Sequence, residues 1–399
     1  MRTYHELFRV PEFSRLFAAS SAMTAASTII ALALGTLVYS ATGSPLLSAL
    51  VMFGPSIAQL AGASLLLSAA DRIPPRAALV WMTLIFALGS FAQALPGIGV
   101  AAIFAVEVAV AVVYSVGGGV QYGLLNEILP ADGYVLGRSV VNMSVGIMQI
   151  IGFAAGGVLV NMLSPRDTLL VGAALYIVSG CIAFFGLTRR AARAAGRPSV
   201  AQTWRDNMLL LSSAPRRYVY LALCVPNGLV VGCESLFVAY SPRHAGTLFA
   251  CTALGMLAGD TLAGRYVSPR WRDRLGPWMR LLLAAPYLAF ITHPSLPVAC
   301  VACAVASVGY SATLMLQQRL MALTPDELTG HALGLHMSCM LAMQGVGAAL
   351  AGTIAELTSP AVGITVMAAT SVVVTLTLAP GLRTGATTPA LNPLTEPPL

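Results

Sequence analysis

The sequence contains no lysine and little charge of either sign. Only 9% of the 399 residues are charged, and all 22 basic residues are arginines. A soluble domain carries about 25% charged residues, so this chain has too few ionic groups to cover a surface that faces water. Because 57% of the residues are hydrophobic and the mean hydropathy is +0.81, we expect the chain to fold in a lipid bilayer.

Other absences restrict the function. The sequence has no glycine-rich phosphate-binding loop with a lysine, which argues against direct use of ATP. The segment 1–17 lacks the short apolar core and cleavage site of a signal peptide, so the first apolar run is expected to be retained. All seven cysteines fall in apolar runs, and the Cys300-x-x-Cys303 spacing has no second pair or nearby histidine. We interpret the cysteines as packing residues and expect neither a metal nor another cofactor.

Apolar runs that are long enough to cross a bilayer occur twelve times. About 20 helical residues span a ~30 Å hydrocarbon core, and these runs lack the alternation that a membrane β-barrel requires. We therefore predict an all-α membrane protein with twelve transmembrane helices. The predicted spans are 13–39, 45–69, 76–95, 97–124, 138–162, 167–188, 217–240, 245–266, 277–293, 295–321, 330–356 and 361–380.

The arginines predict the orientation of these spans. With the N-terminus in the cytoplasm, twenty arginines fall in cytoplasmic segments, and only Arg166 and Arg243 fall outside. Such a bias is typical of membrane proteins, whose cytoplasmic loops are enriched in basic residues. Both termini are thus expected in the cytoplasm, with the chain in the cell membrane, and specifically a bacterial inner membrane.

The longest polar stretch divides the chain into two sets of six spans. We predict an N-terminal six-helix bundle (1–188), a cytoplasmic linker (189–216) that lies partly on the membrane surface, a C-terminal six-helix bundle (217–380) and a cytoplasmic tail (381–399). The two halves also share residues at a constant offset of 195. The matched pairs are Pro130 and Pro325, Gln149 and Gln344, Gly152 and Gly347, Gly157 and Gly352, and Ser164-Pro165 and Ser359-Pro360.

Partial motifs resemble a known family. The segment AADRIPPR (69–76) resembles G-x-x-x-D-R-x-G-R-R, the loop signature between helices two and three of the major facilitator superfamily, with matches at Asp71, Arg72 and Arg76. IIGFAAGGVLV (150–160) resembles the G-P-x-x-G-G motif of antiporter helix five, with Phe153 in place of proline. Together with FSRLF (13–17) and LVYSATGSPLLSAL (37–50), these segments are similar to the drug and siderophore exporter branch.

The resemblance implies two pseudo-symmetric six-helix bundles in the major facilitator fold, with a substrate site between them. It implies a secondary transporter that exports a small amphipathic compound in exchange for protons, and not an enzyme. The alternatives are a proton-coupled importer and, from another class, a membrane scaffold or receptor. The scaffold is disfavoured because the loops are short. The expected partners are a small-molecule substrate, protons and the lipid bilayer, with no nucleic acid, and the chain is expected to act as a monomer.

Polar side chains within the predicted spans are the candidate site residues, because ionisable groups in a bilayer cost free energy and are retained for function. Glu107, near the middle of span four, is the candidate proton carrier; the alternative is a carboxylate paired with a neighbouring helix, or one that is kept protonated. The candidates for the substrate cavity are Glu234, Gln121, Gln149 and Gln344. The alternative for Glu234 is an approach to the lipid headgroups, and the glutamines could equally join helices by hydrogen bonds. The mostly aliphatic spans favour an apolar or weakly polar substrate.

A second group of residues is expected to form a gate at the cytoplasmic side. A carboxylate at the end of span two can stabilise the positive N-terminus of span eleven, which gives Asp71 its candidate role. Asp260 is expected to pair with Arg138 when the cytoplasmic side is closed. His331 and His336, near the start of span eleven, are interpreted as packing groups. The candidate gate residues are Asp71, Arg72, Arg76, Arg138 and Asp260, and the candidate bundle-interface glycines are Gly152, Gly156, Gly157, Gly255 and Gly259.

Overall fold

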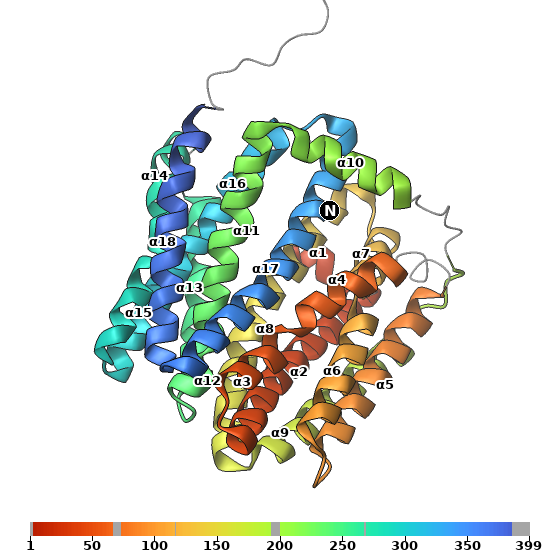
Figure 1. The fold of residues 1–399 in the computed structure, drawn as a ribbon. Coiled ribbons are helices and arrows are strands. Elements are labelled where there is room, and N and C mark those ends of the chain that lie inside the picture. Colours follow the sequence, from red (N-terminus) through yellow and green to blue (C-terminus); the bar gives the residue numbers. More distant parts are fainter. Residues whose placement is uncertain (1–2, 67–72, 116, 193–199, 267–268, 385–399) are drawn as a thin grey trace, which may run out of the picture.

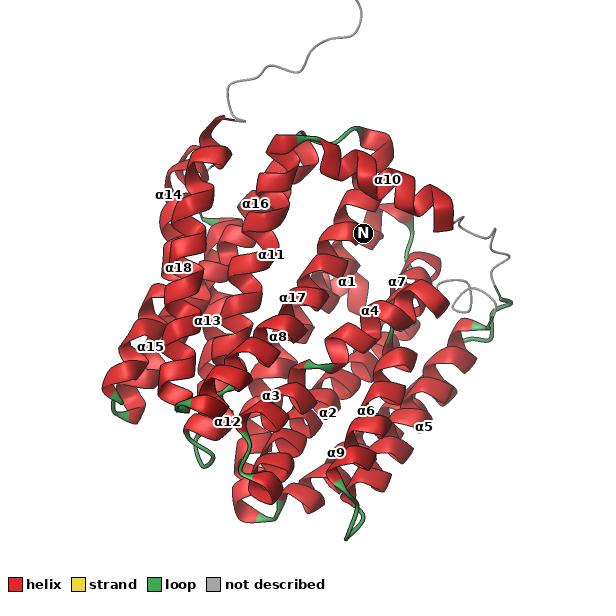
Figure 2. Ribbon diagram, viewed as in Figure 1, coloured by secondary structure: helices red, strands yellow, loops and turns green. Residues whose placement is uncertain are grey.

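The computed structural model describes residues 3–66, 73–115, 117–192, 200–266 and 269–384, and within these ranges the chain is helical with no strand (Figures 1 and 2). Twelve helical segments of the described chain are long and apolar enough to cross a membrane, which confirms the predicted fold class. Each predicted span overlaps one of them.

Several spans consist of more than one helix. The N-terminal half contains α1 (Tyr4–Phe8), α2 (Pro11–Thr42), α3 (Pro45–Phe53), α4 (Pro55–Leu66), α5 (Pro75–Ala94), α6 (Val100–Tyr114), α7 (Gly117–Ile128), α8 (Ala131–Met162) and α9 (Pro165–Gly186). The helix α10 (Val200–Ser212) follows. The C-terminal half contains α11 (Ala214–Ser235), α12 (Phe237–Tyr240), α13 (Ala245–Arg265), α14 (Pro269–Leu282), η1 (Ala285–Thr292), α15 (Leu296–Val308), η2 (Gly309–Ser311), α16 (Ala312–Ala322), η3 (Asp326–Leu328), α17 (Thr329–Leu357) and α18 (Pro360–Thr384).

The helix boundaries follow from local sequence signals. Proline occupies the first turn of α2, α3, α5 and α9, where its missing N–H removes no hydrogen bond. The side chains of Ser44 and Ser164 cap α3 and α9 by accepting from the backbone N–H of Leu47 and Asp167. In the ninth span the helix is irregular, because Pro277 interrupts α14 and the span continues as the 3-10 helix η1.

The two halves lie side by side (Figure 1). Within the N-terminal half, α2 packs against α8 and α9; within the C-terminal half, α11 packs against α17 and α18. Contacts between the halves run mainly through α8 with α13 and through α3 and α4 with α17. Buried hydrophobic clusters fill both halves, such as the one around Phe86 and Tyr176 and the one around Phe237 and Tyr287.

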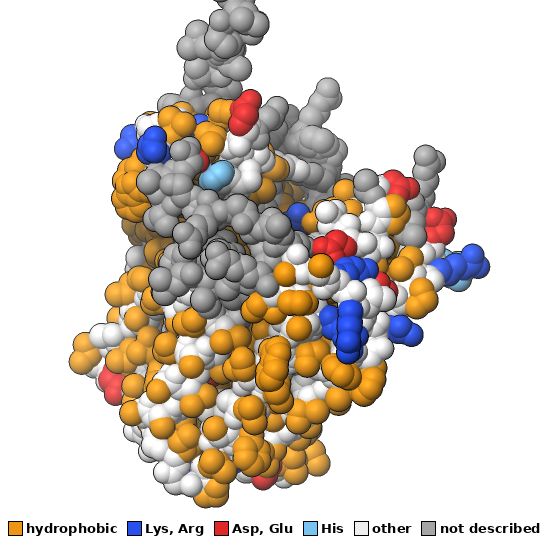
Figure 3. Space-filling view, turned by 90° about the vertical axis from the view of Figure 1, so that its right-hand side faces the viewer, with side chains coloured by type: hydrophobic (Ala, Val, Ile, Leu, Met, Phe, Trp, Pro, Cys, Tyr) orange, Lys and Arg blue, Asp and Glu red, His pale blue; other side chains and the backbone are white. Residues whose placement is uncertain are grey.

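The two ends of the helix bundle differ in charge. We call the end that carries α1, α10 and the loop after α9 the arginine-rich end, and the end that carries the loops 43–44, 95–99, 163–164, 241–244, 293–295 and 358–359 the far end. Figure 3 shows hydrophobic side chains over the lower part of one face, with charged side chains gathered above them. Large apolar side chains such as Trp81 and Phe185 are 61% and 81% exposed, as expected for a surface that contacts lipid.

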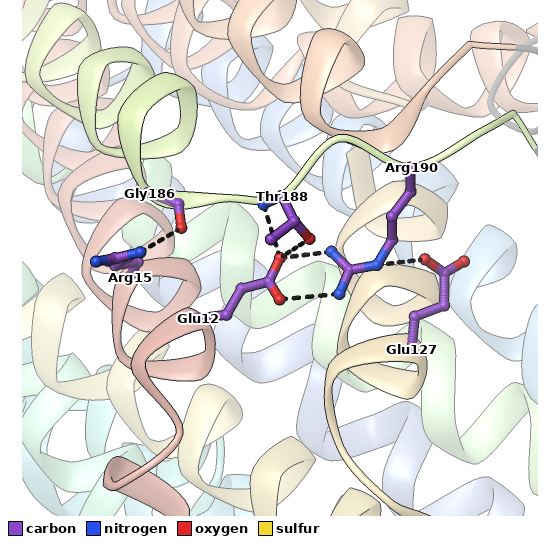
Figure 4. Close-up of polar contacts among 6 residues, drawn as sticks. All are labelled: Glu12, Arg15, Glu127, Gly186, Thr188 and Arg190. Carbon is purple, nitrogen blue, oxygen red and sulfur yellow. Dashed lines mark hydrogen bonds and ion pairs between the residues drawn. The ribbon is translucent and has the colours of Figure 1, made fainter.

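An ion-pair network at the arginine-rich end holds the chain that leaves α9 (Figure 4). Arg190 binds the Glu12 carboxylate with two nitrogens, and its Nε lies 3.3 Å from Glu127 Oε2. Glu12 also accepts hydrogen bonds from the backbone N–H and the hydroxyl of Thr188. The Glu12 carboxylate raises the pKa of Arg190 further above its ordinary value. The network joins the starts of α2 and of the linker to the end of α7.

Candidate functional site

A cavity of about 460 Å³ lies between the halves. This volume is typical of sites that bind small molecules. Its walls come from both bundles. The lining residues are Phe53, Gln149, Phe153, Asn227, Val231, Glu234, Phe249, Thr252, Ala253, Met256, Asp260, Tyr310, Thr313, Leu314, Gln317, Met340 and Gln344.

One face of α11 supplies two deeply buried polar groups of the cavity. Asn227, Val231 and Glu234 are spaced by four and three residues, so they lie on the same side of the helix. Asn227 is 3% exposed and Glu234 is 7% exposed. Asn227 Oδ1 is buried and, within the described structure, has no hydrogen-bond partner. The helix therefore presents an amide and a carboxylate to the cavity about two turns apart.

Two tyrosines hold the Glu234 carboxylate in position. The Tyr310 hydroxyl donates to Glu234 Oε1 over 3.1 Å, and the Tyr287 hydroxyl does so over 3.4 Å. Within the described residues, no cationic side chain pairs with this carboxylate. Hydroxyl donors stabilise the carboxylate without neutralising it, so a proton or a cationic ligand would be needed to neutralise the charge.

A second wall of the cavity is formed by α13. Phe249, Ala253, Met256 and Asp260 are spaced by four, three and four residues and share one face of the helix. Asp260 lies 11 residues beyond Phe249 in the sequence, which is ~16 Å along the axis towards the arginine-rich end. Asp260 is exposed, and the described chain gives it no hydrogen-bonding or ionic partner. It lies at the end of the cavity opposite to Glu234.

The structure brings together four of the predicted site residues in one cavity lining. Glu234, Gln149, Gln344 and Asp260 all line the cavity. Gln121, on α7, is not among the lining residues. Gln317, which sequence reasoning did not select, lines the cavity and lies 3.1 Å from the ring of buried His336. The other predicted packing histidine, His331, lies 3.5 Å from Asp206 of α10.

Glu107 lies within the N-terminal half, away from the cavity lining. Its Oε2 accepts a hydrogen bond of 2.9 Å from Gln93 Nε2 of α5, and Gln93 is 1% exposed. The same amide also donates to the Ile103 carbonyl. This is the environment of a carboxylate paired with a neighbouring helix, which was the alternative interpretation of Glu107. Its candidate role as a proton carrier stays a prediction.

The structure describes three of the five candidate gate residues, Arg76, Arg138 and Asp260. Asp71 and Arg72 lie outside the described residues. Arg76 and Arg138 each stack on an aromatic ring of the N-terminal half, Phe184 at 4.7 Å and Tyr122 at 5.2 Å. The Asp260–Arg138 pair, expected when the arginine-rich end is closed, is not formed here.

The glycines contact different neighbours from those expected. Gly152 and Gly156 face α2 of their own half, near Thr28 and Ile29, rather than the other bundle. Gly255 and Gly259 likewise face Ala304 and Val308 within the C-terminal half. Helices approach closely at all four positions, as small residues allow, but the pairing lies inside each bundle.

Gly157 alone of the five lies at the interface between the bundles. A Cβ atom added to Gly157 would lie 3.0 Å from the Cα atom of Gly246 on α13. One turn further on, Asn161 Nδ2 donates to the Arg243 carbonyl over 2.9 Å. The two helices therefore meet closely at the far end.

A second contact between the halves at the far end was not found from the sequence. Glu356, near the end of α17, accepts hydrogen bonds from the Ser44 hydroxyl (2.8 Å) and from the Leu46 backbone N–H (3.3 Å). The carboxylate thus lies at the N-terminus of α3, where the helix dipole favours a negative charge. With the α8–α13 contact, it joins the two halves at the far end.

The described residues contain no group of three or more His, Cys, Asp or Glu side chains that could hold a metal ion. All seven cysteines are free. The site therefore consists of carboxylates, amides, hydroxyls and aromatic rings, which can bind and orient a ligand by hydrogen bonds, charge and apolar contact.

The comparisons with known proteins agree with this architecture. The Major Facilitator Superfamily model matches residues 16–313, whereas a search of curated proteins gives no match. Similar solved structures include the nucleoside transporter NupG, with a TM-score of 0.74 and 14% identity over 93% of this chain and 99% of that chain. A POT family transporter in complex with 5-aminolevulinic acid has a TM-score of 0.76 and 10% identity over 93% and 96%.

A further neighbour is a bacterial homolog to the human lysosomal transporter Spinster in an inward-facing and unoccupied conformation. Its TM-score is 0.69, with 14% identity over 93% of this chain and 95% of that chain. At such identities these likenesses show the fold alone. The family model, in contrast, covers most of the chain, from the first span into the tenth. The chain belongs to the Major Facilitator Superfamily and is a multi-pass membrane transporter of that type.

Proposed function

We propose that the chain is a secondary active transporter that exports a small amphipathic compound in exchange for protons. The cavity between the halves is the observation that carries this proposal, because its lining combines aromatic and aliphatic walls with a few polar groups. Such a lining suits a ligand with both apolar and polar parts. The resemblance of 150–160 to the helix-five motif of antiporters supports the direction of transport.

The expected orientation indicates how export would proceed. The bias of arginine towards one end favours a cytoplasmic arginine-rich end in a bacterial inner membrane. With the far end closed by the Glu356 and Gly157 contacts, the cavity would then accept substrate from the cytoplasm. Rocking of one half against the other would close the arginine-rich end and open the far end. Asp71, Arg72, Arg76, Arg138 and Asp260 are the proposed gate of that closure.

Import is the alternative direction. It is favoured by the similarity to structures that are described as a nucleoside transporter and as a peptide transporter. An inward-facing arrangement occurs in the cycle of an exporter and of an importer, so the direction must be measured. The experiment is transport of a compound panel into inverted membrane vesicles, with and without an uncoupler. Uncoupler-sensitive uptake into the vesicles supports proton-coupled export. Uptake that ignores the uncoupler contradicts proton coupling, and net movement out of the vesicles supports import.

Glu107 is the proposed proton carrier. The Glu107→Gln variant keeps a hydrogen-bonding side chain beside Gln93 but cannot release a proton. We expect it to lose uncoupler-sensitive transport while it retains substrate binding. Glu327→Gln, at an exposed position in η3, is the matched control and is expected to transport as the wild type does. Unchanged coupling in Glu107→Gln would assign the proton to another carboxylate.

A further inference from the structure

The charge of the cavity lining is one-sided. Two carboxylates, Glu234 and Asp260, face the cavity, and its described lining contains no arginine or histidine. Neither carboxylate has a cationic partner in the described chain. A carboxylate removed from water without a counter-charge is unfavourable, and a bound cation relieves this cost. An anionic ligand would face two like charges.

An orphaned acceptor lies on the same helix face as the buried carboxylate, about two turns away. Asn227 Oδ1 is buried without a hydrogen-bond partner, on the same face of α11 as Glu234. A buried acceptor that lacks a donor costs free energy. Asn227 Oδ1 can therefore accept a hydrogen bond from a ligand. A protonated amine is one group that donates such a bond.

Aromatic rings line the same cavity. Phe153 and Phe249 stack with their ring centroids 4.6 Å apart, and Phe53 lies 6.4 Å from Phe249. They come from α8, α13 and α3 respectively, so both halves contribute to this wall. Ring faces attract cations and provide apolar contact for the body of a ligand.

We propose that the substrate is an organic cation with an aromatic or bulky apolar body, anchored through its charge on Glu234, with its body against Phe53, Phe153 and Phe249. Asp260, at the opposite end of the cavity, attracts the same charge as the ligand enters. This substrate class narrows the proposed transport function and rests on the cavity being its binding site. The cavity volume of about 460 Å³ sets the scale of the ligand.

The test compares two ions of matched shape and opposite charge. Radiolabelled tetraphenylphosphonium is bound to the full-length protein in nanodiscs by scintillation proximity, and tetraphenylborate is used as a competitor. We expect saturable phosphonium binding that the borate does not displace. Stronger binding of the borate, equal binding of both ions, or no phosphonium binding by the folded protein would overturn the proposal.

Variants locate the binding site. Glu234→Gln retains an acceptor for both tyrosines and should weaken phosphonium binding about tenfold or more, because only the charge is lost. Glu234→Asp should retain part of the affinity. Glu327→Gln, far from the cavity lining, should bind as the wild type does; thermal unfolding of each variant checks its fold. Wild-type affinity in Glu234→Gln contradicts this anchor.

The binding test and the transport test fail separately. Phosphonium binding needs neither a proton gradient nor a direction of transport, so it can succeed where uncoupler-sensitive export fails. Conversely, if the inverted vesicles accumulate only neutral or anionic compounds in an uncoupler-sensitive manner, the export function stands and the cationic substrate class is wrong.

Discussion

Two tyrosine hydroxyls decide how Glu234 is held. Tyr287 and Tyr310 come from η1 and η2, on two different spans, and both donate to the same carboxylate oxygen. Both rings are packed against the hydrophobic cluster around Phe237. The carboxylate can therefore adopt few orientations, and the free energy of placing a charge there depends on these two donors.

The Tyr310→Phe variant should reveal this dependence. It removes the shorter of the two hydrogen bonds while it keeps the ring, and a hydrogen bond to a charged group contributes about 2 kcal/mol. We expect the free energy of unfolding in detergent to fall by about that amount. Tyr240→Phe is the matched control, because its hydroxyl has no hydrogen bond in the described structure. Equal loss of stability in both variants would show that the hydroxyl of Tyr310 does not stabilise the carboxylate.

Sequence reasoning found the residues whose chemistry is unusual in a membrane. Glu234, Asp260, Gln149 and Gln344 were selected because polar groups are rare in apolar spans, and all four line the cavity. Tyrosine and phenylalanine are ordinary in such spans, so no signal marked the partners of Glu234. The same reasoning also selected Glu107, which does not line the cavity. Depth in a span does not reveal which neighbour a side chain faces.

At the scale of elements, the N-terminus of α3 and the end of α17 form a contact that depends on conformation. Ser44 caps its own helix through the Leu47 N–H and also donates to Glu356 of the other half. Glu356 accepts in addition from the Leu46 N–H. If the halves separate at the far end, these bonds to Glu356 must break, while the Ser44 cap within α3 can persist. The contact therefore stabilises the far-end-closed arrangement specifically.

Removal of that carboxylate should shift the equilibrium between the two arrangements. In Glu356→Ala, loss of a charge-assisted contact at a helix N-terminus should favour far-end opening by about 1 kcal/mol, or roughly fivefold in population. Distances between spin labels at Met162 and Leu357, which are 77% and 79% exposed at the far end, would measure it. Thr353→Ala is the control, because its hydroxyl bonds only within α17. An unchanged distance distribution in Glu356→Ala would rule out this role.

Helix faces explain why four of the five predicted glycines pack within their own halves in this structure. A four-residue spacing places Gly152 with Gly156, and Gly255 with Gly259, on one face of a helix. The spacing does not specify the neighbour, and these faces turned towards α2 and α15 within their own halves. Gly157, one residue beyond Gly156, points about 100° away and reaches the other bundle. Two adjacent residues of α8 thus make different contacts: Gly156 packs within its bundle, and Gly157 packs against the other bundle.

At the scale of the molecule, the twelve spans were predictable because bilayer thickness fixes the length of an apolar helix. The internal offset of 195 residues indicated two related halves, and Gln149 and Gln344, which it pairs, both line the cavity. The arrangement of one half against the other was not predictable, because it depends on contacts such as Glu356 with Ser44, between residues 312 positions apart. Closure of the far end is therefore a property of the folded structure that local sequence patterns do not contain.

The two ends should balance one another in transport. Glu356 lies in the last turn of α17 and contacts the start of α3. Asp71, which lies outside the described residues, comes after α4 in the sequence and is proposed to act on the start of α17. Asp71→Asn should therefore disfavour closure of the arginine-rich end and slow transport without loss of folding, by about fivefold if its contact is as strong as that of Glu356.

Combining the two substitutions tests this balance. Because Glu356→Ala disfavours one closed arrangement and Asp71→Asn the other, the double variant should return the spin-label distances towards those of the wild type. The measurements are the distances between Met162 and Leu357 labels and the turnover in proteoliposomes. Wild-type turnover in Asp71→Asn, or a double variant whose distances equal those of Glu356→Ala alone, would show that Asp71 does not oppose the far-end contact.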